Sequence, residues 1–124
     1  MLHVLFTCSQ RILIVREPKT WQEAKDHCLS QRGHLFEPRT WAQKSDAKTI
    51  HSELGNRWYW VGGSDLAHEG NWRWLSDNAA VDRFSYWASN EGGNHRNKDC
   101  MYMGWCCLGQ KACNLKAPFA CVLH

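Results

Sequence analysis

The sequence predicts an α+β fold in which two short helices precede a second half of antiparallel strands and long loops. Two helix-start patterns lie in the first half of the chain, at Thr20 and Thr40. From Trp58 onward, short aromatic stretches alternate with Gly, Asn and Asp, which is typical of short strands joined by turns. Seven Cys in 124 residues indicate a disulfide-stapled domain from an oxidising compartment. We therefore expect residues 1–124 to form a single domain.

The N-terminal segment predicts β-structure. Within residues 4–15, the runs 4–6 and 12–15 are apolar and rich in β-branched side chains. Pro18 is expected to end this segment, because proline cannot donate a hydrogen bond to a neighbouring strand.

The run Thr20-Trp21-Gln22-Glu23 predicts the start of a helix over residues 20–32. It is a capping box, in which the Thr hydroxyl accepts from the N3 amide and Glu23 reaches back to the first residue. Trp21, Ala24, Cys28 and Leu29 share one face of such a helix. Gly33 is the expected stop.

The same device recurs at Thr40, with Gln43 three residues later and Pro38 just before. Ala47, Ile50 and Leu54 then form the inward stripe of a second helix, which Gly55 closes. Residues 58–61, 72–75, 100–105 and 117–123 are the strand candidates of the second half. Residues 62–99 between them are polar and irregular, and such long loops commonly carry ligands.

Several spaced motifs then identify the family. Cys28 and Cys121 frame Trp60-Val61-Gly62-Gly63, Gly70-Asn71-Trp72-Arg73-Trp74, Cys100, Cys113 and the closing Pro118-Phe119-Ala120-Cys121. This pattern resembles the C-type lectin-like domain, from about Thr7 to Val122. The run from Gly33 to Thr40 looks more like the invertebrate members than like vertebrate receptors. The resemblance implies the C-type lectin-like fold, with two helices, antiparallel strands and a long irregular loop region.

The resemblance also implies two disulfides, Cys28–Cys121 and Cys100–Cys113. It leaves Cys8, Cys106 and Cys107 without assigned partners. Cys106 and Cys107 could form a vicinal disulfide, or Cys8 could reach one of them. One of the three then stays unpaired or joins another chain, which would give a disulfide-linked dimer.

The calcium site through which many family members bind sugar is mostly replaced here. Aligned on the family pattern, its ligand positions fall on Glu91-Gly92-Gly93, on Lys98 and on Gly109-Gln110. Only Glu91 keeps the expected side chain, and Lys98 places a positive charge where calcium would sit. Because Ca²⁺ requires six to eight oxygen ligands, we expect no calcium at this site.

An auxiliary calcium site of some members is better matched. Its positions fall on Asp65, Glu69, Asn94 and Asp99, all of which have side-chain oxygens. His68 and His95 adjoin the same segments and make zinc an alternative, since imidazole suits zinc. The competing interpretation is that these acids are solvated or cap turns. No cofactor is required by the sequence.

Residues 88–98 form the candidate ligand-binding loop, because they are almost wholly polar and Gly-rich. The side chains expected to contact a ligand are Glu91, Asn94, His95, Arg96 and Lys98, with Trp105 as the aromatic face. Trp58 and Tyr59 are further candidates for that face. Trp60, Trp74 and Trp87 match core positions of the family.

These observations indicate a non-catalytic, secreted recognition domain. Lys and Arg are scattered among acids at a net charge of +3, which argues against nucleic-acid binding, and no apolar run is long enough to span a membrane. Residues 2–6 are too short for a signal peptide, so we expect a mature domain. No phosphate loop or catalytic motif stands out.

Two binding functions remain open. The first is carbohydrate binding on microbial or cell surfaces, as in innate immunity, without calcium at the usual sugar site and with zinc as an aid. The alternative is a calcium-independent, protein-binding lectin-like domain. The partner is accordingly a glycan or a surface protein, and ice binding, known on this fold, has no specific signal.

Overall fold

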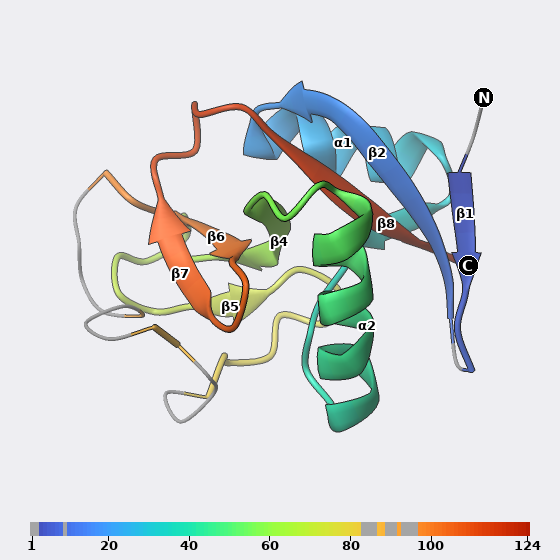
Figure 1. Cartoon of the computed structure of the whole chain (residues 1–124). Coiled ribbons are helices and arrows are strands. Elements are labelled where there is room, and N and C mark those ends of the chain that lie inside the picture. Colours follow the sequence, from blue (N-terminus) through green and yellow to red (C-terminus); the bar gives the residue numbers. More distant parts are fainter. Residues whose placement is uncertain (1–2, 9, 83–86, 89–91, 93–96) are drawn as a thin grey trace.

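The computed structural model describes residues 3–8, 10–82, 87–88, 92 and 97–124 (Figure 1). Along the chain the elements are β1 (His3–Phe6), β2 (Arg11–Lys19), α1 (Trp21–Ser30), β3 (Gly33–Leu35), α2 (Trp41–Glu53), β4 (Tyr59–Ser64), β5 (Arg73–Trp74), β6 (Cys100–Met103), β7 (Leu108–Lys111) and β8 (Ala117–Leu123). The strands form one sheet in the order β1-β2-β8-β4-β6-β7, in which β3 also pairs with β8 and β5 with β4. The parallel pair is β4 with β8, and the other pairs are antiparallel.

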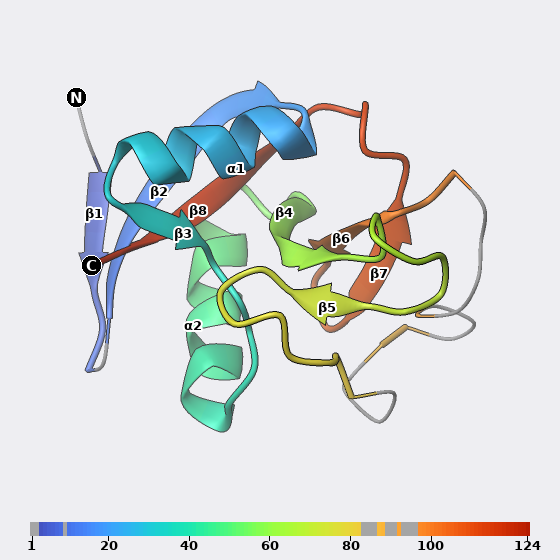
Figure 2. The same cartoon turned by 180° about the vertical axis from the view of Figure 1, so that it is seen from behind.

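The two helices cover opposite faces of the sheet, with α2 in front in Figure 1 and α1 in front in Figure 2. Strand alternation explains this arrangement, because successive side chains point to opposite faces. On β2, Ile12 and Ile14 join the cluster with Ile50 of α2, whereas Leu13 joins the cluster with Trp21 of α1. The core therefore has one apolar layer on each side of the central strands.

Both capping boxes form as the sequence predicts. Thr20 accepts from the Glu23 amide while Glu23 accepts from Thr20, and Thr40 and Gln43 make the same reciprocal pair. The second helix ends as expected, with Leu54 as C-cap and Gly55 at φ +72°.

The expected stop at Gly33 is wrong. The first helix ends earlier, with Gln31 as its C-cap, and the left-handed residue that follows is Arg32, at φ 59°. Gly33 instead begins β3, where a Cβ would collide with the Val122 carbonyl of β8. This glycine is required by close strand packing rather than by a helix end.

The strand predictions are right in place but not in every boundary. Pro18 lies within β2, beside a register shift between Val15 and Lys19, so it does not end the strand. Two strands, β3 and β7, are not predicted from the sequence, because they are short and contain Gly. The predicted start of the irregular region, at residue 62, lies inside β4.

Disulfides join the ends of the fold as expected. Cys28–Cys121 links α1 to β8, and Cys100–Cys113 links β6 to the turn after β7. Cys106 and Cys107 form a vicinal disulfide between β6 and β7. Cys8 is exposed and has no disulfide partner. No helix in the described part of the chain is long and apolar enough to cross a membrane.

A buried carboxylate fixes the first part of the long loop region. Glu37 is 4% exposed and accepts hydrogen bonds from the Ser76 amide at 2.9 Å and the Ser76 hydroxyl at 2.7 Å. Arg39 bridges Glu37 and Asp77, with nitrogen–oxygen distances of 3.4 and 3.1 Å. Burial raises the pKa of Glu37 despite these partners. The network holds the turn after β5 against the segment before α2.

Thr20→Ala should lower the free energy of unfolding by about 1 kcal/mol, because it removes the acceptor of the Glu23 amide at the start of α1. Urea denaturation would measure this loss. Thr49→Ala, at an exposed position inside α2, is the matched control and should not destabilise the protein. Equal losses in the two variants would contradict this role of the capping box.

Candidate functional site

The pairing of β4 with β6 brings two acidic residues together. Ser64 lies opposite Cys100 in this antiparallel pair, so Asp65, which follows β4, lies beside Asp99, which precedes β6. The Asp65 amide donates to the Asp99 carbonyl at 3.1 Å. These residues are far apart in sequence, and the sheet register alone makes them neighbours.

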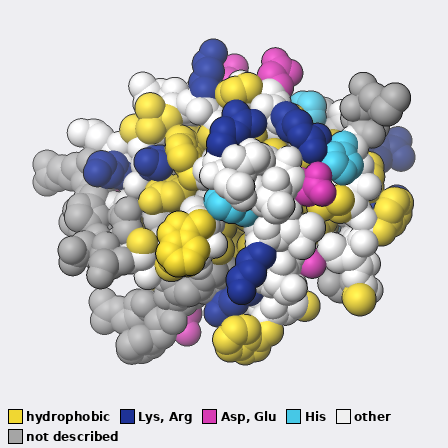
Figure 3. Space-filling model, viewed as in Figure 1, with side chains coloured by type: hydrophobic (Ala, Val, Ile, Leu, Met, Phe, Trp, Pro, Cys, Tyr) yellow, Lys and Arg dark blue, Asp and Glu magenta, His cyan; other side chains and the backbone are white. Residues whose placement is uncertain are grey.

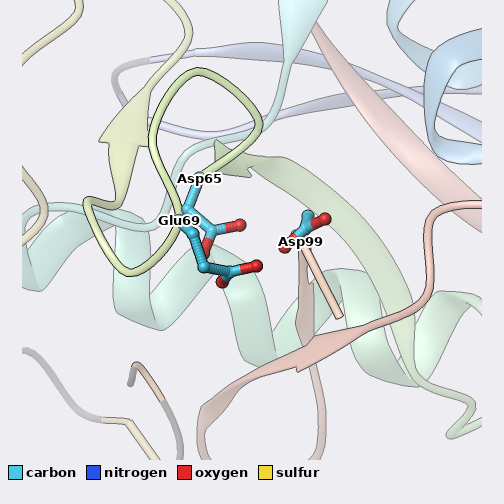
Figure 4. A group of neighbouring side chains, drawn as sticks. All are labelled: Asp65, Glu69 and Asp99. Carbon is cyan, nitrogen blue, oxygen red and sulfur yellow. The ribbon is translucent and has the colours of Figure 1, made fainter. Parts of the chain in front are cut away.

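A tight loop adds a third carboxylate. The Gly70 amide donates to the Asp65 side chain at 2.7 Å, which folds residues 65–70 back on themselves. Glu69 thereby joins Asp65 and Asp99, and the three carboxylates each have an oxygen within 4.8 Å of the others. Figure 4 shows Asp65 and Glu69, from this loop, facing Asp99 across a common space. We refer to these three residues as the acidic cluster.

The acidic cluster is electrostatically unfavourable as it stands. Asp65 is 2% exposed, and its Oδ1 atom is buried without a hydrogen-bond partner, as is Oδ1 of Asp99. Burial, opposed by the Gly70 amide and reinforced by Glu69 and Asp99, raises the pKa of Asp65 to about 7. Buried charges are ordinarily paired or bind metals, so these oxygens are suited to a cation.

The donor set favours a hard cation. The acidic cluster contains only carboxylate oxygens, and no His among the described residues belongs to it. His68 precedes Glu69 and is exposed. Asn94, the fourth expected ligand, and His95, the second candidate for zinc, lie outside the described residues. The structure therefore brings together Asp65, Glu69 and Asp99 of the predicted metal ligands.

The positions of the usual sugar site are arranged differently. A Cβ at Gly109 would lie 2.5 Å from Cζ of Tyr102, so the tyrosine ring fills the place of a ligand side chain. Gln110 is 2% exposed and accepts a hydrogen bond from the Gly92 amide at 2.8 Å. This bond attaches the long loop directly to β7.

The predicted ligand-binding residues divide into three groups. Glu91, Asn94, His95 and Arg96 lie outside the described residues. Lys98 is exposed just before β6, whereas Trp105 is 77% exposed just after it. Since β6 is an extended strand, Lys98 and Trp105 lie near opposite ends of it.

The other aromatic candidates lie in the core or at its edge. Tyr59 is fully buried and donates to the Ala47 carbonyl at 3.0 Å, so the prediction that it offers a ligand face is wrong. Trp58 is half-buried and packs edge-on against Trp60 and Tyr102. Trp60 and Trp74 are buried, and Trp87 is packed against the core, as predicted.

Trp41, which is 84% exposed at the start of α2, is not among the predicted ligand residues. A signal for it existed, because Trp41 lies off the inward stripe of Ala47, Ile50 and Leu54. The role of Gln110 as an anchor of the loop is also not predicted, because this role depends on the conformation at Gly92.

Comparisons with known proteins agree with this fold. The family model described as Lectin C-type domain matches residues 17–123. Perlucin-like protein of Mytilus galloprovincialis is 33% identical over 87 residues, covering 66% of this chain and 53% of the mussel protein, so the chain spans about half of that relative. The mouse scavenger receptor C-type lectin carbohydrate-recognition domain superposes with a TM-score of 0.85 at 21% identity, covering 97% of this chain and 92% of that chain. A Ca²⁺-dependent type II antifreeze protein, in its Ca²⁺-free form, gives 0.82 at 18% identity, covering 98% and 97%.

The last two proteins are named for different activities, carbohydrate recognition and antifreeze action. A shared fold therefore does not specify the ligand, which must be argued from the residues of the site. C-type lectin domains are generally non-catalytic binding domains.

In the metal-free protein, the contribution of Asp65 to stability should fall as the pH rises from about 4 to about 8. The folded-state pKa of Asp65 is about 7, above its ordinary value of 3.8, so its contribution is complete below about 4 and is lost as the pH passes through about 7. Thermal unfolding in EDTA would measure this loss. Asp65→Asn has no titrating carboxyl at this position, so its stability should lack the part of the pH dependence that Asp65 contributes. Asp26→Asn, on the exposed side of α1, should keep the wild-type pH profile, and an unchanged profile in Asp65→Asn would contradict the assignment.

Proposed function

Since the chain belongs to the Lectin C-type domain family, we propose that it is a secreted, non-catalytic recognition domain for carbohydrate on microbial or cell surfaces. Residues of the 88–98 loop bind the ligand. One calcium ion at the acidic cluster stabilises this loop. The usual sugar-binding position takes no calcium. Residues 1–124 act as one recognition unit.

The acidic cluster carries this proposal. It holds two buried carboxylate oxygens without partners, one on Asp99 directly after the segment 88–98 and one on Asp65 at the start of the loop 65–70. A divalent cation would satisfy both oxygens and offset the burial and the neighbouring carboxylates that raise the pKa of Asp65. Three carboxylates supply part of the six to eight oxygens that Ca²⁺ takes, and the amide of Asn94, backbone carbonyls or water would supply the rest.

Direct hydrogen bonding replaces metal coordination of the sugar in this proposal. Tyr102 fills the side-chain position at Gly109, and Gln110 is already bonded to Gly92. The ligand hydroxyls are left to Glu91, Asn94, His95, Arg96 and Lys98. Sugar recognition by these residues would not need calcium at the usual site.

The remaining features fit an extracellular protein. The chain has three disulfides, and disulfides form and persist mainly in oxidising compartments. Cys8, which follows the edge strand β1, is the thiol through which two chains would join as a disulfide-linked dimer.

Calcium should stabilise the wild type, by about 2.7 kcal/mol when its concentration is one hundred times the dissociation constant. Asp65→Asn and Asp99→Asn keep the side-chain shape but remove the charge, so both should abolish this gain. Titration calorimetry and thermal unfolding would measure it, with Asp26→Asn as the control. Zinc is tested in parallel, and a preference for zinc would replace calcium in the proposal. Calcium binding that survives both cluster variants but is lost in Gln110→Ala would contradict the assignment.

Glycan binding should depend on the charged residues of the loop. Glu91→Ala and Arg96→Ala should each weaken binding to microbial polysaccharides about ten- to a hundredfold, because hydrogen bonds to charged groups contribute about 1.5–3 kcal/mol. Pull-downs with calcium, zinc or EDTA, on variants checked for folding, would measure this. Lys116→Ala, an exposed charge outside the loop, is the control. If the wild type binds no glycan under any metal condition, the protein-binding alternative replaces this proposal.

A further inference from the structure

A second surface lies at the opposite end of the β4–β6 pair from the acidic cluster. It is a hollow of about 390 Å³ between α2 and the turn that joins β6 to β7. The residues that line it are Trp41, Lys44, Ser45, Lys48, Met103, Trp105 and Cys106. Figure 3 shows hydrophobic side chains next to Lys and Arg side chains over this part of the molecule. We call this hollow the tryptophan pocket.

Two exposed indoles border the tryptophan pocket. Trp41 is 84% exposed and Trp105 is 77% exposed, whereas the indoles of Trp21 and Trp60 are buried. An exposed Trp ring costs hydrophobic free energy that burial against a ligand would recover. Neither ring is part of the core, so packing does not explain why Trp occupies these positions.

The geometry of α2 gives the pocket a positive charge. Trp41, Lys44, Ser45 and Lys48 are spaced i, i+3, i+4 and i+7, so they share one helical face. The acids of α2 lie elsewhere, since Asp46 interacts with Thr7 and Glu53 pairs with Arg16. The first turn of α2 contains no acid, and the helix dipole adds positive potential there.

The opposite wall is held in place by the chain itself. The Gly104 amide donates to the Cys107 carbonyl at 2.9 Å, and the disulfide between Cys106 and Cys107 constrains the same turn. Trp105 lies at the tip of this turn. On the α2 wall, the Lys44 ammonium lies over the Trp41 ring, 4.5 Å from the ring centroid. This cation–π contact fixes the relative position of the charge and the ring. A turn with a constrained backbone presents its side chain to a ligand at a lower entropic cost than a mobile loop does.

We propose that the tryptophan pocket is a second, metal-independent site for an anionic saccharide, which bears carboxylate or sulfate groups. The apolar faces of a sugar ring pack on Trp41 and Trp105, and Lys44 and Lys48 bind the anionic group. The Ser45 hydroxyl is available to a sugar hydroxyl. A hollow between the two rings favours an inserted sugar over a flat lipid surface.

The inference rests on the proposed function, carbohydrate recognition, and names anionic saccharides as a ligand class. It assigns this class to the tryptophan pocket and not to the 88–98 loop. The acidic cluster would repel an anionic ligand unless a cation is bound, whereas the tryptophan pocket attracts one without any metal. The two proposals therefore differ in the effect of EDTA and can fail separately.

The test is calorimetric titration in EDTA at low salt with two matched pairs of probes. Oligogalacturonate is compared with its neutral methyl ester, and dextran sulfate is compared with dextran. The anionic member of at least one pair should bind at least tenfold more tightly than its neutral partner, and high salt should weaken that binding. The pair that responds identifies the anion as carboxylate or sulfate.

Trp41→Ala, Trp105→Ala and Lys48→Gln should each weaken the binding about tenfold or more, with Lys48→Arg retaining it. Leu29→Ala and Lys116→Gln, exposed changes elsewhere, should bind as the wild type does. Asp26→Asn, an exposed charge change on α1, should also leave it unchanged. Thermal unfolding confirms that the variants are folded.

Three results would overturn the inference. One is equal affinity for the charged and neutral probes, and another is full binding by both Trp variants. The third is that neither anionic polysaccharide binds. Phosphatidylglycerol vesicles serve as a further probe, and binding to them alone would indicate a lipid surface instead of a saccharide.

Discussion

The pairing of β4 with β6 is the contact on which both proposed sites depend. At one end, Ser64 opposite Cys100 places Asp65 beside Asp99. At the other end, Tyr59 lies opposite Met103, which lines the tryptophan pocket, and the Tyr59 hydroxyl bonds to the Ala47 carbonyl of α2. At about 3.3 Å per residue, this strand separates the two sites by roughly 15–20 Å. A shift of one residue in the register would separate the acids and move the wall that carries Trp105 away from α2.

The sequence predicts those parts of the fold that depend on local patterns. Both helices follow from a Thr with Glu or Gln three residues later, since capping acts within one turn. The two long-range disulfides follow from family spacing, and the core position of Trp60 follows from its motif. The role of Gly33 does not follow from a local pattern, because the residue that requires a glycine there is Val122, whose carbonyl lies on another strand.

The candidate site was predicted less completely, for the same reason. The acids at 65, 69 and 99 could be named from the family pattern, but their burial and lack of partners follow only from the sheet register. Tyr59 looked like an exposed aromatic, yet the core of α2 and β4 buries it. The sequence predicts Trp105 as a ligand residue, but its neighbour Trp41 comes from a helix that sequence spacing alone does not place beside it.

The two ends of the β4–β6 pair have opposite electrostatic characters, although the net charge of the chain is only +3. The acidic cluster concentrates negative charge in a place with unpartnered buried oxygens, and the tryptophan pocket concentrates two lysines on an aromatic surface. Charges of one sign gathered in a hollow attract a ligand of the other sign more strongly than the net charge suggests. A bound cation would neutralise the acidic end and leave the basic end unchanged. A glycan that carries both hydroxyl-rich and anionic residues would then contact the 88–98 loop and the tryptophan pocket through different chemistry, and the metal would affect only the first contact.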